Sequence, residues 1–304
     1  MTGAQQKNLA VSVRQRLLNI SREQREDFQL ILIRFALERL ISRISQSEYG
    51  DQFILKGAML FQIWSRESHR PTRDVDFLGQ GEHSESRYRE IFETLCSIDA
   101  EDGLAFDATS IQVATMKEEE TYQGVRIKLN AFLASARIPI QVDIGFGDAI
   151  TPGPIEINYP TILEFSAPRI KSYPRETVVA EKFQAMVMLG IANSRMKDFF
   201  DIWILSRQFD FDGISLCQAI SATFNRRDTV LPSETPLALS KEFSDDSQKR
   251  TQWNAFLKKG ALQVDGRTFN TILTELEAFL MPPTLSILSG DEFNFEWLPA
   301  GPWR

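Results

Sequence analysis

Cysteine and histidine are scarce in this chain of 304 residues, which contains two of each. Cys96 and Cys217 lie far apart and in no CxxC spacing, so we expect buried free thiols rather than a disulfide framework or a zinc site. The histidines, His69 and His83, have no ligand or nucleophile spacing around them. The sequence therefore favours neither a zinc centre nor a histidine-assisted nucleophile.

Long apolar segments are also absent. The first residues lack the apolar stretch of a signal peptide and no segment is long enough for a membrane span, so we expect a soluble, cytoplasmic protein without a membrane partner. A net charge of −7 argues mildly against a surface built for nucleic acid. Residues 1–45 differ, with eight basic against four acidic residues. They form either a solvated helix face or a surface that faces RNA.

The order of patterns predicts an α+β fold with helices at both ends. Residues 22–46 have helical apolar spacing, and Ser21 is their candidate N-cap. Strands are expected at 53–55, 75–78, 124–133 and 137–144, and helices at 57–64, 84–97, 176–190, 197–207, 214–224 and 268–280. Residues 228–250 are expected to form a polar connection.

A Pro- and Gly-rich run at 151–160 is a candidate domain boundary, although a surface loop explains it nearly as well. We expect N-terminal helices and a mixed-sheet core in residues 1–160 and a mainly helical domain in residues 161–304.

Asp74-Val75-Asp76 carries the clearest chemical pattern. Side chains alternate along a strand, so Asp74 and Asp76 project from one face while Val75 and Phe77 point into a core. Two neighbouring carboxylates repel each other, and Mg²⁺ prefers one or two carboxylates together with phosphate oxygens. The pattern therefore predicts a metal site that also binds phosphate.

A third carboxylate follows in the strand predicted at 137–144. Its apolar residues share one face, which places Asp143 on the other. Alone, Asp143 is more simply explained as an aspartate at a strand end, because two glycines follow closely. Beside Asp74 and Asp76, it fits the three-carboxylate arrangement of two-metal phosphoryl transfer.

Lys56, Gly57 and Ala58 connect the first strand to the helix after it. The first amides of a helix are unpaired and bind phosphate. A glycine after a strand is usually only a turn, so the phosphate interpretation depends on the Asp-x-Asp strand that follows.

Lys182 lies in an otherwise apolar helical segment, ahead of a group of charged residues. Asp198 and Asp201 fall on one helix face, and Lys197 can pair with Asp201. The simplest interpretation is a set of weak surface ion pairs. In the functional interpretation, Lys182 neutralises nucleotide phosphates, and the two aspartates orient basic groups or the acceptor.

These motifs occur in a fixed order: LKGAML with RPTRDVDFL, then VDIGFGD, ETVVAEKFQAMV and NSRMKDFFD. Together they resemble the AbiEii/AbiGii-type nucleotidyltransferase toxins of the DNA-polymerase-β-like superfamily, over roughly residues 53–205. Many members of the superfamily have Ser or Gly where this chain has Ala58. That departure leaves phosphate contacts to Lys56 and backbone amides.

The resemblance implies a polymerase-β-like core that transfers a nucleoside monophosphate from an NTP to an acceptor, typically the 3′ end of tRNA. It also implies a cognate antitoxin, a role in phage defence and two Mg²⁺ ions. By motif position, Asp74, Asp76 and Asp143 would hold metal; Lys56, Gly57, Ala58, Arg73, Lys182 and Lys197 would bind the nucleotide; and Asp198 or Asp201 would be the essential downstream aspartate.

Three other interpretations remain open. The acceptor of the same chemistry could be a small molecule or a partner protein. A non-catalytic RNA-binding regulatory module is disfavoured because unpaired buried carboxylates are costly to keep. A metal-dependent nuclease would need neither Lys56-Gly57 nor Lys182 for a triphosphate.

Overall fold

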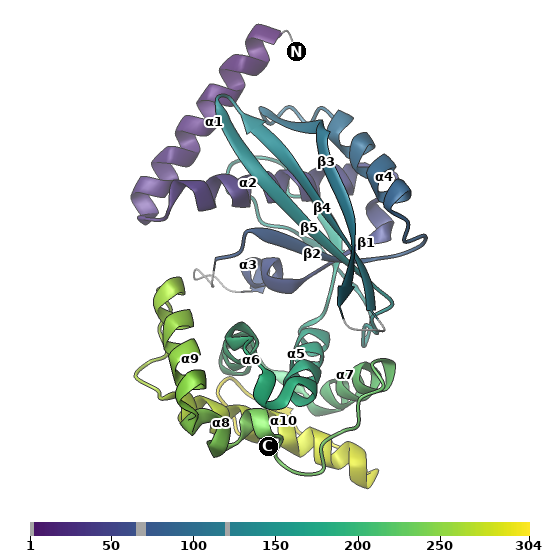
Figure 1. The fold of residues 1–304 in the computed structure, drawn as a ribbon, viewed down its shortest axis with the longest axis vertical. Helices are drawn as coiled ribbons and strands as arrows, with labels where there is room; N and C mark the ends of the chain where they lie inside the picture. The colour runs from purple at the N-terminus through teal and green to yellow at the C-terminus, as the bar shows by residue number, and fades with distance from the viewer. Residues whose placement is uncertain (1–2, 65–70, 119–121) are drawn as a thin grey trace. The chain divides into compact units, whose positions relative to one another are not determined.

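The computed structural model describes residues 3–64, 71–118 and 122–304. Contacts divide the chain into two compact units (Figure 1). Unit 1 comprises Met1–Gly147 and Ile155–Ser172, and unit 2 comprises Asp148–Pro154 and Tyr173–Arg304. Residues 161–172, which the sequence pattern assigned to the helical domain, thus belong to unit 1, and residues 148–154 belong to unit 2.

Unit 1 is built on a seven-stranded mixed sheet with the strand order β3-β4-β5-β2-β1-β7-β6. Strand β2 pairs in parallel with β5 and antiparallel with β1, and β1 pairs in parallel with β7. The strands are β1 (Phe53–Lys56), β2 (Asp74–Gly79), β3 (Leu104–Glu118), β4 (Tyr122–Leu133), β5 (Ala136–Phe146), β6 (Ile155–Asn158) and β7 (Arg169–Ser172). The predicted α+β class is confirmed.

Helices flank this sheet, and α2 passes behind β4 and β5 in Figure 1. They are α1 (Gly3–Gln24), α2 (Phe28–Gln46), the 3-10 helices η1 (Gly50–Gln52) and η2 (Gly57–Leu60), α3 (Phe61–Trp64) and α4 (Glu85–Ser97). A buried charge pair anchors α2, because Arg43 donates to both carboxylate oxygens of Asp102 at 2.7 and 3.1 Å. The same guanidinium also donates to the Leu104 carbonyl.

The helix predicted at 22–46 with Ser21 as its N-cap is wrong in one respect. The helix is interrupted between the end of α1 and the start of α2, where Arg25 has a positive φ of 53°. Asp27 is the N-cap of α2, since its carboxylate accepts from the Leu30 amide at 3.0 Å. Ser21 instead donates to the Glu26 carbonyl at 2.7 Å and so closes the turn between the helices.

Unit 2 is mainly helical, as predicted. Its elements are α5 (Arg175–Leu189), η3 (Gly190–Ala192), α6 (Met196–Gln208), β8 (Phe211–Asp212), α7 (Gly213–Arg226), η4 (Leu237–Leu239), α8 (Lys241–Asp245), α9 (Ser247–Gly260), α10 (Phe269–Ser289) and β9 (Glu296–Trp297). The predicted polar connection at 228–250 is only partly a connection, because α8 and the start of α9 fall within it. Among the residues the structure describes, no helix is long and apolar enough to span a membrane.

Helix α10 continues through Pro282 and Pro283, where the sequence pattern ended it. Proline has no amide hydrogen, so Pro283 leaves the carbonyl of Phe279 without its usual helical donor. The indole Nε1 of Trp303 donates to that carbonyl at 3.0 Å, and the Trp303 ring stacks on the Phe279 ring. Trp303 thus supplies the hydrogen bond that Pro283 cannot donate within the helix.

Residues 148–154 join two strands of unit 1 but are bonded within unit 2. Arg227 Nη2 lies 3.2 Å from Asp148 Oδ1, and the Tyr173 hydroxyl donates to Asp148 Oδ2 at 3.1 Å. Thr151 and Thr177 exchange two hydrogen bonds, at 3.0 and 2.9 Å. Side chains of unit 2 therefore fix this segment.

Candidate active site

Strand β2 carries Asp74 and Asp76 on one face and an apolar surface on the other. Val75 and Phe77 have no exposed surface, whereas both aspartates are partly exposed. The predicted alternation along this strand is therefore confirmed. Thr72 donates its hydroxyl to Asp74 Oδ1 at 2.6 Å, and the neighbouring Arg73 is exposed.

The strand register brings four charged residues into one row across the sheet. Lys56 of β1 lies opposite Asp76 of β2, Asp76 lies opposite Asp143 of β5, and Asp143 lies opposite Arg126 of β4. Residues in register project from the same face of a sheet. We call these four residues the charged row. Its two carboxylates lie in the middle, with a cation on each side.

Asp143 is firmly paired within this row. Arg126 donates to both of its oxygens, from Nε to Oδ1 and from Nη2 to Oδ2, each at 2.7 Å. Gln141 Nε2 also donates to Oδ2, at 3.0 Å. The Asp143 side chain is 15% exposed and that of Arg126 is 38% exposed. The third predicted carboxylate therefore has a guanidinium of its own chain as partner.

Gly57 is needed for close approach of the backbone to Asp76. Its φ is +73°, and a Cβ added there would lie 2.0 Å from Asp76 Oδ2. The segment that follows is the four-residue 3-10 helix η2 and the four-residue α3, in which Ala58 is buried. These helices are too short for a strong dipole. Gly57 thus makes room for the Asp76 carboxylate, and Lys56 is the cation next to it.

The carboxylate oxygens have the donor chemistry that Mg²⁺ prefers. Asp74 and Asp76 fit such an ion as a pair, because they share a face two residues apart and are partly exposed. Asp143 adjoins Asp76 but is engaged by Arg126. In the described ranges, no three or more His, Cys, Asp or Glu side chains are grouped closely enough to hold a metal. Asp74 and Asp76 therefore fit a metal ion as they lie. Asp143 could bind the same ion only after it separates from Arg126.

Lys182 of α5 joins the two downstream aspartates in unit 2. Its Nζ lies 2.6 Å from Asp198 Oδ1 and 2.9 Å from Asp201 Oδ2. Arg195 Nε lies 2.7 Å from the other oxygen of Asp198. We call these four residues the Lys182 cluster. The two aspartates have no exposed side-chain surface, so they are not the surface ion pairs of the simplest interpretation.

Charge outweighs burial at Asp198. Burial alone would raise the pKa of this carboxyl, but the ammonium of Lys182 and the guanidinium of Arg195 favour its ionised form. As a result, the pKa of Asp198 lies below its ordinary value. Lys197, by contrast, is exposed at the start of α6. The cluster therefore holds an ionised aspartate in a buried position.

Sequence reasoning missed Arg126, Thr72 and Arg195. Arg195 had a local signal, since it lies three residues before Asp198 in the charged group that follows Lys182. Arg126 had one as well, because the alternation of 124–133 already places it on the polar face of its strand. Its pairing with Asp143 depends on the register set by the turn at Ala134 and Ser135. Those two residues are not a typical hairpin turn sequence.

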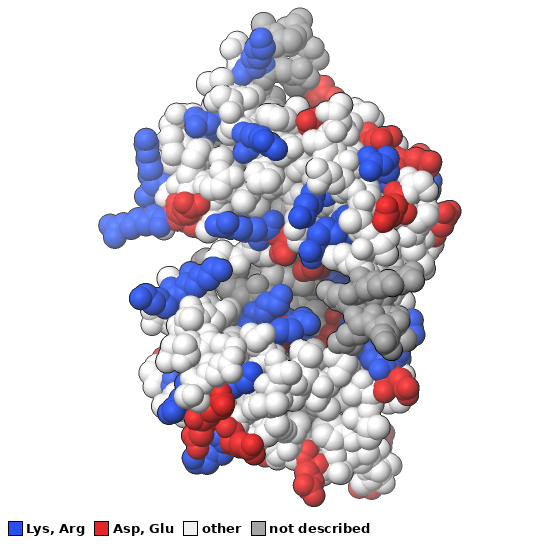
Figure 2. Space-filling model, in the orientation of Figure 1, with Lys and Arg blue, Asp and Glu red and all other residues white. Residues whose placement is uncertain are grey.

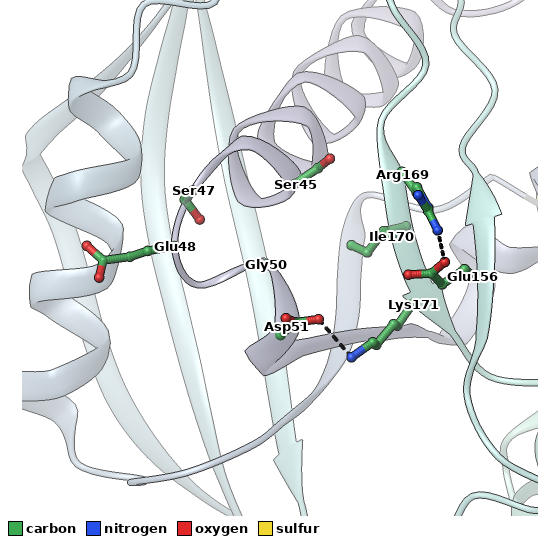
Figure 3. Close-up of a pocket in the computed structure, with 9 residues that line it drawn as sticks. All are labelled: Ser45, Ser47, Glu48, Gly50, Asp51, Glu156, Arg169, Ile170 and Lys171. Carbon is green, nitrogen blue, oxygen red and sulfur yellow. Dashed lines mark hydrogen bonds and ion pairs between the residues drawn. The ribbon is translucent and has the colours of Figure 1, made fainter.

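A pocket of about 450 Å³ lies elsewhere in unit 1, beside the end of α2 and the strands β6 and β7 (Figure 3). In it, Lys171 pairs with Asp51 at 2.7 Å, and Arg169 pairs with Glu156. The lining residues are Ser45, Ser47, Glu48, Gly50, Asp51, Glu156, Arg169, Ile170 and Lys171. These differ from the site residues predicted from the sequence.

Comparison with protein families gives a match to the nucleotidyl transferase AbiEii toxin family, a type IV toxin–antitoxin system, over residues 39–275. The chain belongs to this family. The match contains the Asp-x-Asp strand, Asp143 and the Lys182 cluster, and it confirms the resemblance found in the sequence motifs. The protein is therefore a nucleotidyl transfer enzyme of the toxin class, and its family implies an NTP substrate and an antitoxin.

Two solved structures are similar to this chain. A Helicobacter pylori protein assigned to the nucleotidyltransferases is 13% identical, with a TM-score of 0.50, and the match covers 88% of this chain and 99% of that one. JHP933 from Helicobacter pylori is 12% identical, with a TM-score of 0.48, and the match covers 87% and 96%. The similarity to the first of these structures supports the fold described above. No curated protein matches the chain.

Proposed function

We propose that the chain transfers a nucleoside monophosphate from an NTP to the 3′ end of tRNA, with Mg²⁺ held by Asp74 and Asp76. The observation that carries the proposal is the charged row, in which Asp76 and Asp143 are neighbours on one sheet face. Bound there, Mg²⁺ would neutralise negative charge that develops on the phosphates and on the acceptor oxygen.

Each protein residue then has a limited task. Asp74 and Asp76 hold the cation, and Thr72 orients Asp74 through its 2.6 Å hydrogen bond. Asp143, once released from Arg126, is the candidate acceptor of the proton from the attacking hydroxyl. Asp143 would also help Asp74 and Asp76 to hold the second ion of a two-metal site.

The nucleotide contacts are assigned from the motif resemblance. Lys56, beside Asp76, and Lys182, between two buried aspartates, are the cations that we propose for the phosphates. Arg73 and Lys197 are exposed and remain candidates for the same ligand. Because Asp198 and Asp201 both contact Lys182, we propose that they act together in fixing its position.

An RNA acceptor is supported by the charge of unit 1. On the face that Figure 2 shows, Lys and Arg side chains gather over the region of α1, β4 and β5, whereas acidic side chains are more frequent over α4. Exposed basic residues of these elements are Lys7, Arg16 and Arg22 in α1, and Lys128 and Arg137 in β4 and β5. Such a surface attracts a polyanion despite the net charge of −7.

The test is transfer of label from each of the four α-³²P-labelled NTPs to total tRNA by the purified protein in Mg²⁺. We expect Asp76→Asn to lose at least about 10³-fold in rate, as expected when a main electrostatic contribution is lost. The matched control is Asp51→Asn, which changes an exposed aspartate of the same unit that pairs with Lys171. This control should retain wild-type activity.

The labelled species decides between acceptors. Label on the tRNA 3′ end supports the proposal, whereas label on a protein or a small molecule would replace the acceptor but keep the chemistry. Full transfer by Asp76→Asn would refute the carboxylate site itself.

A further inference from the structure

The guanidinium of Arg126 occupies both oxygens of Asp143 at once. Two parallel N–H···O bonds of 2.7 Å form the forked pairing that arginine makes with carboxylates, which is oriented and charge-assisted. Gln141 adds a third donor on the same carboxylate. Asp143 is therefore neutralised by its own chain before any metal binds.

The neighbours of this pair explain why a positive charge is favourable there. Asp76 lies in register with Asp143, and two adjacent carboxylates destabilise each other unless a cation lies nearby. A divalent ion and a guanidinium can each supply that charge. Because the two cations repel each other, they compete for the same carboxylate.

Exposure allows Arg126 to change partner. Its side chain is 38% exposed, and its partner Asp143 is 15% exposed. Movement of the guanidinium therefore does not require the sheet core to open. Phosphate oxygens accept the same forked pairing as a carboxylate, so a triphosphate is a chemically equivalent alternative partner.

We propose that Arg126 is a positioning residue that holds Asp143 until a nucleoside triphosphate arrives and then pairs with its phosphate oxygens. The exchange makes Asp143 accessible to metal only when nucleotide is present. Metal and nucleotide are therefore bound together rather than independently, which is a positive coupling between two ligands. This inference rests on the proposed function, since it requires Asp76 to take part in metal binding.

The coupling can be measured without catalysis. Mn²⁺ is titrated into the full-length protein, and the free ion is followed by electron paramagnetic resonance, with and without an α,β-methylene NTP of each base. Wild type should bind Mn²⁺ weakly alone and at least about tenfold more tightly with an analogue. In Arg126→Gln, binding of Mn²⁺ alone should tighten about tenfold because a competing charge is gone. Binding of the analogue should weaken about tenfold because a phosphate partner is lost.

Lys128→Gln is the matched control, because Lys128 lies two residues along the same strand, on the same face, and is exposed. It removes the same charge without touching Asp143. Arg126→Lys keeps the charge but loses the fork, so its Mn²⁺ affinity should lie between those of wild type and Arg126→Gln. This variant also serves if Arg126→Gln does not fold.

Several outcomes would overturn the inference. One is an unchanged Mn²⁺ affinity in both Arg126 variants, and another is an equal shift in Arg126→Gln and Lys128→Gln. Asp76→Asn in the same titration separates the two proposals. If that variant loses Mn²⁺ binding while the Arg126 variants match wild type, only the exchange is refuted. If it binds both ligands as wild type does, the metal site of the proposed function is refuted as well.

Discussion

The Lys182 cluster of unit 2 and the charged row of unit 1 differ in how far their aspartates and cations are buried. In unit 2, Asp198 and Asp201 have no exposed side-chain surface, and Lys182 between them is 12% exposed. In unit 1, Asp143 and Arg126 retain 15% and 38% exposure. A buried charge that loses its partner is costly, whereas a partly exposed one is compensated by water. The comparison indicates that the Lys182 cluster is a fixed part of the fold, while the charged row can exchange partners.

Replacing Lys182 should have the largest effect and tests most strongly whether the Lys182 cluster is a fixed part of the fold. Lys182→Met leaves two buried carboxylates with Arg195 as their remaining cation in the cluster, and it should lower the free energy of unfolding by about 3–5 kcal/mol. Urea unfolding followed by circular dichroism measures this loss. Asp76→Asn in the charged row should change the same quantity by less than about 1 kcal/mol, because it removes one of two neighbouring like charges.

A double variant separates stability from catalysis at Lys182. Lys182→Met combined with Asp201→Asn removes one charge of each sign and leaves Asp198 with Arg195. It should recover most of the lost stability but none of the transfer activity. Recovery of activity would show that Lys182 acts only on the fold.

A second prediction tests whether the free-energy cost of a charge depends on its burial rather than on the unit that contains it. Glu38 of unit 1 is buried beside Arg39 and accepts from the Ile162 amide at 2.7 Å. Burial outweighs the charge of Arg39 and raises the pKa of Glu38 from 4.5 to about 7. Between these values the folded protein keeps a proton on Glu38 that the unfolded chain releases. The contribution of Glu38 to stability is therefore greatest below pH 4.5 and is lost as the pH rises to about 7.

The expected decline is on the order of 3 kcal/mol, and Glu38→Gln should flatten it while still accepting from Ile162. Urea unfolding at several pH values measures the slope. Glu23→Gln, an exposed change in α1, is the control. Asp198 has a lowered pKa, so its contribution is present above about pH 4 and is lost only on further acidification. If the free energy of unfolding still declines with pH in Glu38→Gln, another group causes the decline.

A smaller loss of stability than at Lys182 or Glu38 is expected at Gly57, whose backbone lies against the Asp76 carboxylate. Gly57→Ala should cost about 2 kcal/mol, because φ is positive and the new methyl group overlaps Asp76. Gly81→Ala is the control, with a positive φ and no atom within 4 Å, and should cost about 1 kcal/mol. Only Gly57→Ala should also weaken Mn²⁺ binding. Equal metal binding in both variants would contradict the close approach to Asp76.

The sequence allowed the central strands to be predicted because their alternation is regular. Val75 and Phe77 are buried and the aspartates beside them are not, as the period of two requires. Strand β3 was missed for a physical reason. A register shift between Asp107 and Gln112 changes its phase, so that Phe106 and Ile111 are both buried although they are an odd number of residues apart.

Partners across elements were harder to predict than the elements themselves. Nothing local indicated that Lys182 would be buried between Asp198 and Asp201, because the pairing depends on how α5 packs against α6. Helix α9 was missed because Lys249 and Trp253 are its buried residues, too few for a periodic pattern. The two prolines of α10 likewise suggested a helix end, and only Trp303 shows how the helix continues.

The segment at 148–154 has a consequence during synthesis. Asp148 leaves the ribosome 79 residues before Arg227, and its partner Tyr173 also follows β5. Strands β1 to β7 can assemble while the connection between β5 and β6 still lacks Arg227. The nascent chain thus completes its sheet first and secures the loop after Asp143 last. A ribosome-bound chain that ends before Arg227 should therefore show this loop as readily cleaved by protease, and the finished protein should not.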